Sequence, residues 1–128
     1  MKTIAVLIIS FAALVIGGCA YKSSVTQYRA EKIHLNHPGW DQETTRKVAA
    51  RKIEQGMTPE MVEAALGRPD VISQEGNEEK WGYSVVRDKG TGMGEVYREF
   101  VYFVYLRDGL VTRTQGDPRQ LTLFPWYK

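Results

Sequence analysis

The chain has 128 residues, which is enough for one domain and too few for two ordinary ones. Its 43% hydrophobic and 25% charged residues are typical of a globular protein, and a net charge of +2 is too small to indicate nucleic-acid binding. The single cysteine, Cys19, excludes an internal disulfide.

The N-terminus has the pattern of a bacterial lipoprotein leader. Lys2 gives it a basic start, and residues 4–16 form an apolar run that has the length of a signal-peptide core and is too short to span a bilayer comfortably. Two small residues, Gly17 and Gly18, then precede Cys19. This sequence resembles a lipobox, in which the thiol is acylated and the leader is cut just before it.

We therefore predict that residues 1–18 are a signal peptide and that Cys19 is lipidated. The alternative is a buried thiol inside an uncleaved anchor. Ala20, rather than Asp, follows the cysteine, and this resembles the default for delivery to the outer membrane with the domain facing the periplasm. At about 0.8 kcal/mol for each buried methylene, two or three acyl chains would hold the protein at the membrane.

Residues 19–40 show no sustained helical or strand period and are rich in polar side chains. They predict a lipidated N-terminus and a flexible tether. His34 and His37 are three residues apart, a spacing that can suggest a metal site. Because neither a third ligand nor a helical frame accompanies them, we expect solvated histidines and no bound metal.

Residues 41–128 predict one domain, which opens with a helix over residues 41–55. Asp41 is its N-cap, and Gly56 ends it. An apolar stripe runs along this helix through Thr45, Val48, Ala49 and Ile53. The basic side chains on its other faces could touch anionic head groups, but an ordinary solvated surface is favoured.

A second, shorter helix is marked by start and stop signals. Thr58 is a good N-cap, and Pro59 suits the first helical position, where its missing N–H costs nothing. Gly67 can take the left-handed conformation after the last turn, and Pro69 prevents the helix from continuing. A helix this short is unstable in water alone, so we expect it to dock on the strand that follows.

The rest of the chain predicts a sheet. Strand-like runs cover residues 80–87, 95–107 and 110–115, with 71–75 as a short lead-in, and Asp108-Gly109 is a strong hairpin signal. We predict an α+β fold in which two N-terminal helices pack on one face of a three-stranded antiparallel meander. Within it, Trp81 and Tyr83 are expected to be core residues under the short helix rather than a ligand platform.

The strand 95–107 is apolar on both sides. Its alternation predicts that Phe100, Tyr102, Val104 and Leu106 face one way, and that Val101, Phe103 and Tyr105 face the other. Two explanations stay open for the second face. The C-terminal residues Leu121, Leu123, Phe124, Trp126 and Tyr127 could cover it, or it could be an exposed patch for a partner. In the second case the contact residues would be Val101, Phe103 and Tyr105, with Trp126 and Tyr127 from the tail.

No pattern indicates catalysis or a cofactor. Gly90, Gly92 and Gly94 lie between two strands, whereas a phosphate-binding glycine loop must enter a helix. Glu75, Glu78 and Glu79 flank a turn and are expected to be solvated. No serine lies in a nucleophile elbow. We therefore predict that the protein is not an enzyme.

The short helix and its strand resemble a known family. The similarity rests on Ile53, Gly56-Met57-Thr58, Val62, Leu66-Gly67, Pro69, Trp81 and Tyr83, and it extends to about Val111. This pattern resembles the small bacterial outer-membrane lipoproteins of the SmpA/OmlA (BamE-like) group. The resemblance implies a membrane-tethered scaffold that binds another envelope or outer-membrane protein, in outer-membrane β-barrel assembly or envelope maintenance. The alternative is an envelope enzyme inhibitor or ligand sensor of the same architecture, with residues 88–95 as the inserting loop.

Overall fold

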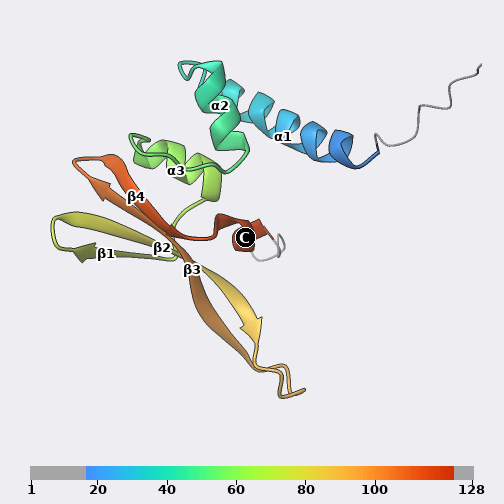
Figure 1. Ribbon diagram of the computed structural model, residues 1–128, viewed down its shortest axis with the longest axis vertical. Coiled ribbons are helices and arrows are strands. Elements are labelled where there is room, and N and C mark those ends of the chain that lie inside the picture. Colours follow the sequence, from blue (N-terminus) through green and yellow to red (C-terminus); the bar gives the residue numbers. More distant parts are fainter. Residues whose placement is uncertain (1–16, 123–128) are drawn as a thin grey trace, which may run out of the picture.

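The computed structural model describes residues 17–122, with side chains for residues 25–121. This part of the chain forms three α-helices, a four-stranded antiparallel sheet and a final 3-10 turn (Figure 1). The elements are α1 Gly17–Asn36, α2 Gln42–Ala49, α3 Pro59–Leu66, β1 Val71–Glu75, β2 Glu78–Asp88, β3 Val96–Arg107, β4 Leu110–Gly116 and η1 Pro118–Thr122. The α+β class is confirmed, but the predicted arrangement of two helices on three strands is wrong.

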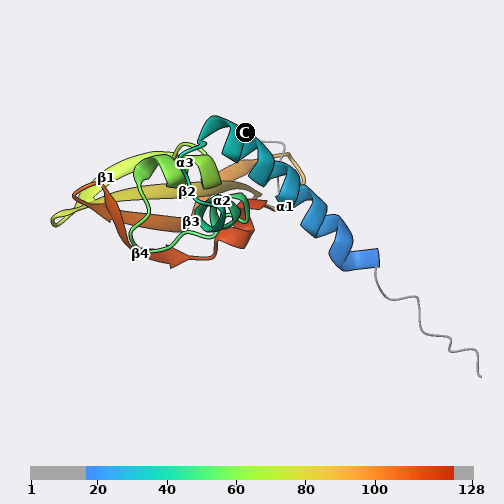
Figure 2. The same cartoon turned by 90° about the horizontal axis from the view of Figure 1, so that it is seen from above.

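The additional helix is α1, which occupies most of the segment expected to be a tether. Its sequence carries no continuous apolar stripe, and Ile33 is its only residue in the core cluster among the described side chains. A second contact comes from Arg29, whose Nη2 donates to the Ala65 carbonyl oxygen at 3.3 Å. The first part of α1 extends away from the other elements (Figure 2). Tertiary contacts at its C-terminal half, rather than an amphipathic pattern, therefore place this helix.

The additional strand is β1. It pairs with β2 along its whole length, from Val71 opposite Gly82 to Glu75 opposite Glu78. All five of its residues are exposed, so there is no alternation of buried and exposed side chains that the sequence pattern could show. Gly76, with φ +65°, makes the tight turn between the two strands. The expected lead-in is thus a full edge strand.

Helix α2 begins where the sequence predicts and ends earlier. The Thr44 N–H donates to Asp41 Oδ1 at 2.6 Å, which confirms the N-cap. The helix ends at Ala49 rather than at residue 55, because Arg51 takes a left-handed φ of 58°. The Lys52 N–H then bonds to the Lys47 carbonyl oxygen and the Arg51 N–H to that of Val48, the pair of bonds of a Schellman ending. A residue other than glycine rarely takes a left-handed φ, so Arg51 gives no signal in the sequence that α2 ends here.

The structure confirms the predicted start and stop signals of the short helix α3. The Met61 N–H donates to Thr58 Oγ1 at 3.3 Å, and Gly67 follows the last turn with φ 84°. The fully buried Tyr83 donates from its hydroxyl to the Gly67 carbonyl oxygen at 3.1 Å. Helix α3 is therefore docked on β2 at its C-terminal end, and Tyr83 is a core residue as expected.

All three α-helices lie on one side of the sheet (Figures 1 and 2). The core lies between the two layers. Its buried hydrophobic residues are Ile33, Val48, Ala49, Met57, Val62, Ala65, Leu66, Trp81, Tyr83, Val85, Val101, Tyr102, Val104, Leu106, Val111 and Leu121. No described element covers the opposite side of the sheet, which we call the open face.

Candidate functional site

A bulge in β3 decides which side chains reach the open face. Tyr83 pairs with Tyr102, but the next residue, Ser84, pairs with Phe100, so Val101 is the extra residue of β3. Val101 is 7% exposed and belongs to the core cluster. The expectation that Val101 shares a face with Phe103 and Tyr105 is therefore wrong, and Phe100 takes its place.

The open face carries an apolar patch made by Val71, Phe100, Phe103 and Tyr105, which we call the open-face patch. The rings of Phe100 and Phe103 stack with centroids 6.0 Å apart. Val71 and Phe100 pack over Gly82, where an added Cβ would lie 2.7 Å from Val71 Cγ1 and 3.1 Å from the Phe100 ring. Glycine at this position therefore lets two side chains from neighbouring strands approach each other.

Two cations cover one end of the patch. The Arg113 guanidinium lies 3.4 Å from the centroid of the Tyr105 ring, and Lys80 Nζ lies 4.6 Å from that of Phe103. Tyr105 is only 1% exposed and donates from its hydroxyl to Gln115 Oε1 at 3.1 Å. Cations over aromatic faces are stabilising. At this end of the patch, the charged groups of Lys80 and Arg113 therefore cover the aromatic rings.

The other end of the patch is bare. Phe100 is 44% exposed and Val71 is 42% exposed. Val71 follows Asp70 in the chain. Asp70 accepts hydrogen bonds from the Ser84 N–H at 2.7 Å and from the Ser84 hydroxyl at 2.9 Å, and Ser84 is the residue of β2 that pairs with Phe100. Exposed aromatic surface bordered by polar groups is typical of a contact site for another macromolecule.

The carboxylates at the β1–β2 turn are held as anions. Lys80 donates to Glu75 Oε2 at 2.8 Å, and this hydrogen bond lowers the pKa of Glu75. Glu78 accepts from the Thr112 hydroxyl at 2.5 Å and pairs with Arg113 at 3.1 Å, and these contacts, that of Thr112 first, lower its pKa. A general acid needs the opposite shift, so these groups lack the property that acid catalysis requires.

The two histidines have different surroundings in the structure. His37 lies 3.3 Å from a Glu60 carboxylate oxygen and stacks on Trp40 with centroids 3.9 Å apart, so it connects the α1–α2 loop to α3. His34 lies on α1. Over residues 17–122 no group of three His, Cys, Asp or Glu side chains is placed to hold a metal ion.

Three of the predicted site residues are not placed with their side chains. Trp126 and Tyr127 lie outside the described residues, and Cys19 lies in α1 with its side chain among those not described. Sequence reasoning missed Val71 and Phe100. The one available signal was Gly82, since a glycine inside a strand often marks a close approach of neighbouring groups.

None of the described helices is both long enough and apolar enough to cross a membrane. A protein-family model described as the outer membrane protein assembly factor BamE domain matches residues 45–115, which is more than half of the chain. The predicted resemblance is therefore confirmed, and the match includes the whole open-face patch. No curated protein matches the chain.

Proposed function

The chain belongs to the family of outer membrane protein assembly factor BamE domains, and from this premise we propose that it is a lipid-anchored binding module of the cell envelope. It takes part in the assembly or maintenance of outer-membrane β-barrel proteins. It binds another envelope protein and catalyses no reaction. The acylated residue is Cys19, which holds the domain at the periplasmic surface of the outer membrane and raises its effective concentration for partners there.

The open-face patch supports this proposal most directly. One sheet face buries the core under three helices, while the other presents exposed Phe100 and Val71 beside Phe103. Burying an exposed phenylalanine is worth about 1.5–3 kcal/mol. The covering cations Lys80 and Arg113 already have carboxylate partners, so they restrict the partner at one end without requiring it to be acidic.

The test is affinity purification of the full chain from detergent-solubilised membranes. The variant Phe100→Gln removes the exposed ring, and we expect recovery of outer-membrane assembly proteins to fall more than about tenfold. Tyr97→Gln is the matched control, because Tyr97 lies on the same strand and is 46% exposed. Unchanged recovery with Phe100→Gln would reject the open-face patch as the contact.

A second candidate function is inhibition of an envelope enzyme, and the β2–β3 hairpin favours it. This hairpin projects away from the rest of the molecule (Figure 1). At its tip Met93 is 84% exposed, in the loop between Asp88 and Val96. The same purification separates the two functions: one soluble enzyme, lost in Met93→Gln and retained in Phe100→Gln, would support inhibition.

A further inference from the structure

Strand β1 is an edge of the sheet that no described element covers. The strand order is β1-β2-β3-β4, so β1 pairs only with β2. The edge at β4 is different, because the segment before α3 continues the ladder there. The Gly56 N–H donates to the Val111 carbonyl oxygen at 2.8 Å, and the Val111 N–H donates to that of Met57 at 2.9 Å. Of the two outer strands, β1 thus leaves its outward backbone groups unpaired within residues 17–122.

The backbone groups of Ile72 and Gln74 face this free edge. The Asp70 N–H donates to the Gly82 carbonyl oxygen at 2.9 Å, so the backbone of Gly82 is turned toward β1. Gly82 lies opposite Val71. Hydrogen-bonded and non-hydrogen-bonded pairs alternate along an antiparallel ladder. Val71 therefore bonds to β2, and the N–H and C=O groups of Ile72 and Gln74 point away from β2.

The usual features that block an edge strand are missing from β1. Proteins protect such edges with prolines, bulges and charged side chains, lysine above all. The sequence of β1 is Val-Ile-Ser-Gln-Glu, and its register with β2 runs without a shift. Its one charged residue, Glu75, lies at the turn and pairs with Lys80 at 2.8 Å. The rest of β1 is therefore an open template for a further strand, which would lie about 4.8 Å away.

The first half of β1 favours apolar residues in such a strand. Val71 lies on the open face and is 42% exposed. Ile72 lies on the helical side, opposite the buried Trp81, and is 57% exposed. Apolar side chains directly opposite each other on neighbouring strands stabilise a sheet. An added strand therefore fits best with apolar residues opposite both Val71 and Ile72.

The second half of β1 favours a basic residue. Gln74 lines a hollow of about 340 Å³ under the start of α3. Glu79, which lies opposite Gln74 on β2, lines it too, together with Asp108. The cation in this lining is Arg107, and it already lies 3.7 Å from Glu78. A lysine or arginine opposite Gln74 in an added strand would therefore complement the two carboxylates.

A second copy of the chain matches this pattern poorly. In an antiparallel pair of two β1 strands centred on Ser73, Ile72 of one copy would lie opposite Gln74 of the other, beside the acidic hollow. Val71 would lie opposite Glu75. Apolar side chains would thus meet polar ones at every position except the centre, so the strand that fits belongs to another protein.

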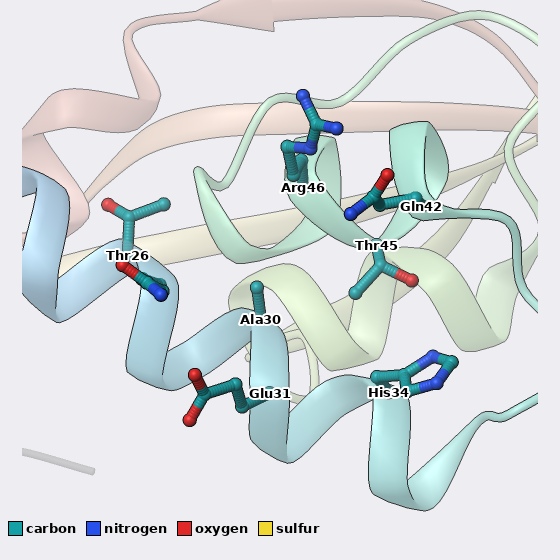
Figure 3. A pocket seen from close by; sticks show the side chains of 8 residues that line it. Thr26, Ala30, Glu31, His34, Gln42, Thr45 and Arg46 are labelled. Atoms are coloured by element: carbon teal, nitrogen blue, oxygen red, sulfur yellow. The ribbon is translucent and has the colours of Figure 1, made fainter.

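The helical side also has a larger groove, of about 900 Å³, between α1 and α2 (Figure 3). Its lining combines Glu31, His34 and Arg46 with the amides of Gln27 and Gln42. In Figure 3 the carboxylate of Glu31 and the guanidinium of Arg46 point away from each other. This mixture of charges favours no one class of ligand, whereas the edge of β1 prescribes both a strand and the order of its side chains.

We propose that β1 binds an extended segment of the envelope protein partner by antiparallel strand addition, an inference that rests on the proposed function. Antiparallel pairing continues the ladder of the sheet and is the more stable arrangement. The segment carries a basic residue opposite Gln74 and apolar residues opposite Ile72 and Val71. Its main chain bonds to the outward groups of Ile72 and Gln74, and its side chain beside Val71 extends the open-face patch.

The test is affinity purification of the full chain from detergent-solubilised membranes, and the probe is the set of outer-membrane assembly proteins that the unsubstituted chain recovers. Gln74→Pro removes an outward N–H but no hydrogen bond to β2, and its ring obstructs an added strand. We expect recovery to fall more than about tenfold. Val86→Pro is the matched control and should leave recovery unchanged. Val86 lies two residues beyond Ser84, whose N–H donates to Asp70 on the β1 side of β2, so its own N–H faces the same edge away from β1 itself.

The outcomes separate this inference from the proposed function. Recovery that falls in Phe100→Gln but not in Gln74→Pro would overturn strand addition and leave the open-face contact standing. No recovery with the unsubstituted chain would overturn both. Light scattering of the purified full chain tests for self-pairing, and a dimer that Gln74→Pro dissociates would overturn the proposal in favour of two paired β1 strands.

Amide hydrogen exchange of the unsubstituted chain gives a second measurement, which decides the matter if circular dichroism shows that Gln74→Pro does not fold. The outward amides of Ile72 and Gln74 should exchange fast in the free chain and more than about tenfold more slowly in the recovered complex. The Ser73 amide lies in the ladder with β2 and is the internal control, so it should change far less. Unchanged exchange at Ile72 and Gln74 would overturn the proposal.

Discussion

At the scale of single residues, the composition of the open face depends on where β3 bulges. Gly116, with φ +97°, lies so close to Val101 that an added Cβ would be 2.1 Å from the Val101 carbonyl oxygen. The Asp117 N–H also donates to that carbonyl, at 3.2 Å. These contacts hold Val101 in the core and thereby turn Phe100 to the opposite face. Strict alternation along β3 cannot predict this, because the constraint comes from a residue of β4.

Replacement of Gly116 by alanine is expected to destabilise the domain by about 2–4 kcal/mol, since it combines left-handed strain with a backbone clash. Gly109→Ala is the matched control. Gly109 also has a left-handed φ, of 74°, but no atom lies within 4 Å of an added Cβ, so a loss of only about 1 kcal/mol is expected. Urea unfolding followed by tryptophan fluorescence measures both. Equal losses in the two variants would contradict the close contact with Val101.

At the scale of elements, the start and stop signals in the sequence predicted α3 correctly. The sequence did not predict α1, and it predicted β1 only as a short lead-in. Thr58, Pro59 and Gly67 act through local backbone chemistry, and local chemistry is visible in a sequence. The position of α1 depends instead on Ile33 and Arg29 contacting other elements, which no local pattern contains. The prediction of β1 as a lead-in failed for the same reason, because its pairing with β2 leaves every side chain exposed.

The C-terminal end of α2 gives a prediction of its own. Arg51 takes a left-handed φ of 58° at a position where glycine is preferred, and its burial near other groups lowers its pKa. Arg51→Gly is expected to raise the free energy of unfolding by up to about 1 kcal/mol, because the relief of backbone strain exceeds the added entropy of the unfolded chain. Thermal unfolding would measure it. Lys52→Gly next to it, outside the left-handed position, is expected to destabilise the domain.

The ion pairs at the β1–β2 turn predict how stability depends on pH. The pKa values of Glu75 and Glu78 are lowered in the folded state, so their contribution is present above the unfolded carboxyl pKa of about 4.3 and is lost as the pH falls through the folded values. Glu78→Gln is therefore expected to lower stability at about pH 7 and to flatten the fall in stability below about pH 4.3. Denaturant unfolding at several pH values measures this.

The control for that series is Glu63→Gln, since Glu63 is exposed on α3 and forms no ion pair with the described side chains, and it is expected to leave stability at neutral pH unchanged. A Glu78→Gln profile parallel to that of the unsubstituted protein would show that the contacts of Glu78 with Thr112 and Arg113 contribute nothing to the acid transition.

At the scale of the whole molecule, the sheet has one covered face and one open face. This arrangement follows more from the number of apolar residues than from their order along the strands. The sequence contains enough apolar residues for one core, and the strand that is apolar on both sides indicated a second apolar surface. Which residues form that surface could not be predicted, because the answer depends on the bulge at Val101 and on Val71 from β1. Two of the predicted contact residues, Phe103 and Tyr105, do lie on the open face, and Tyr105 is hidden there by Arg113.

The position of Cys19 near the start of α1 gives a prediction about membrane attachment. After cleavage before Cys19, α1 would run from Cys19 to Asn36 and be about 27 Å long, and the first part of α1 extends away from the sheet (Figure 2). With acyl chains on Cys19, α1 would act as a spacer between the membrane and the domain, which a flexible tether would not do.

We expect intact-mass analysis of the detergent-extracted protein to find an acylated N-terminal Cys19. We also expect Cys19→Ser to move the protein from the membrane to the soluble fraction. The domain should stay folded in this variant but recover far less partner, because tethering no longer raises its effective concentration. An unmodified N-terminus that retains residues 1–18 would refute the lipid anchor without affecting the prediction for Phe100→Gln, since that substitution acts on the contact surface and not on attachment.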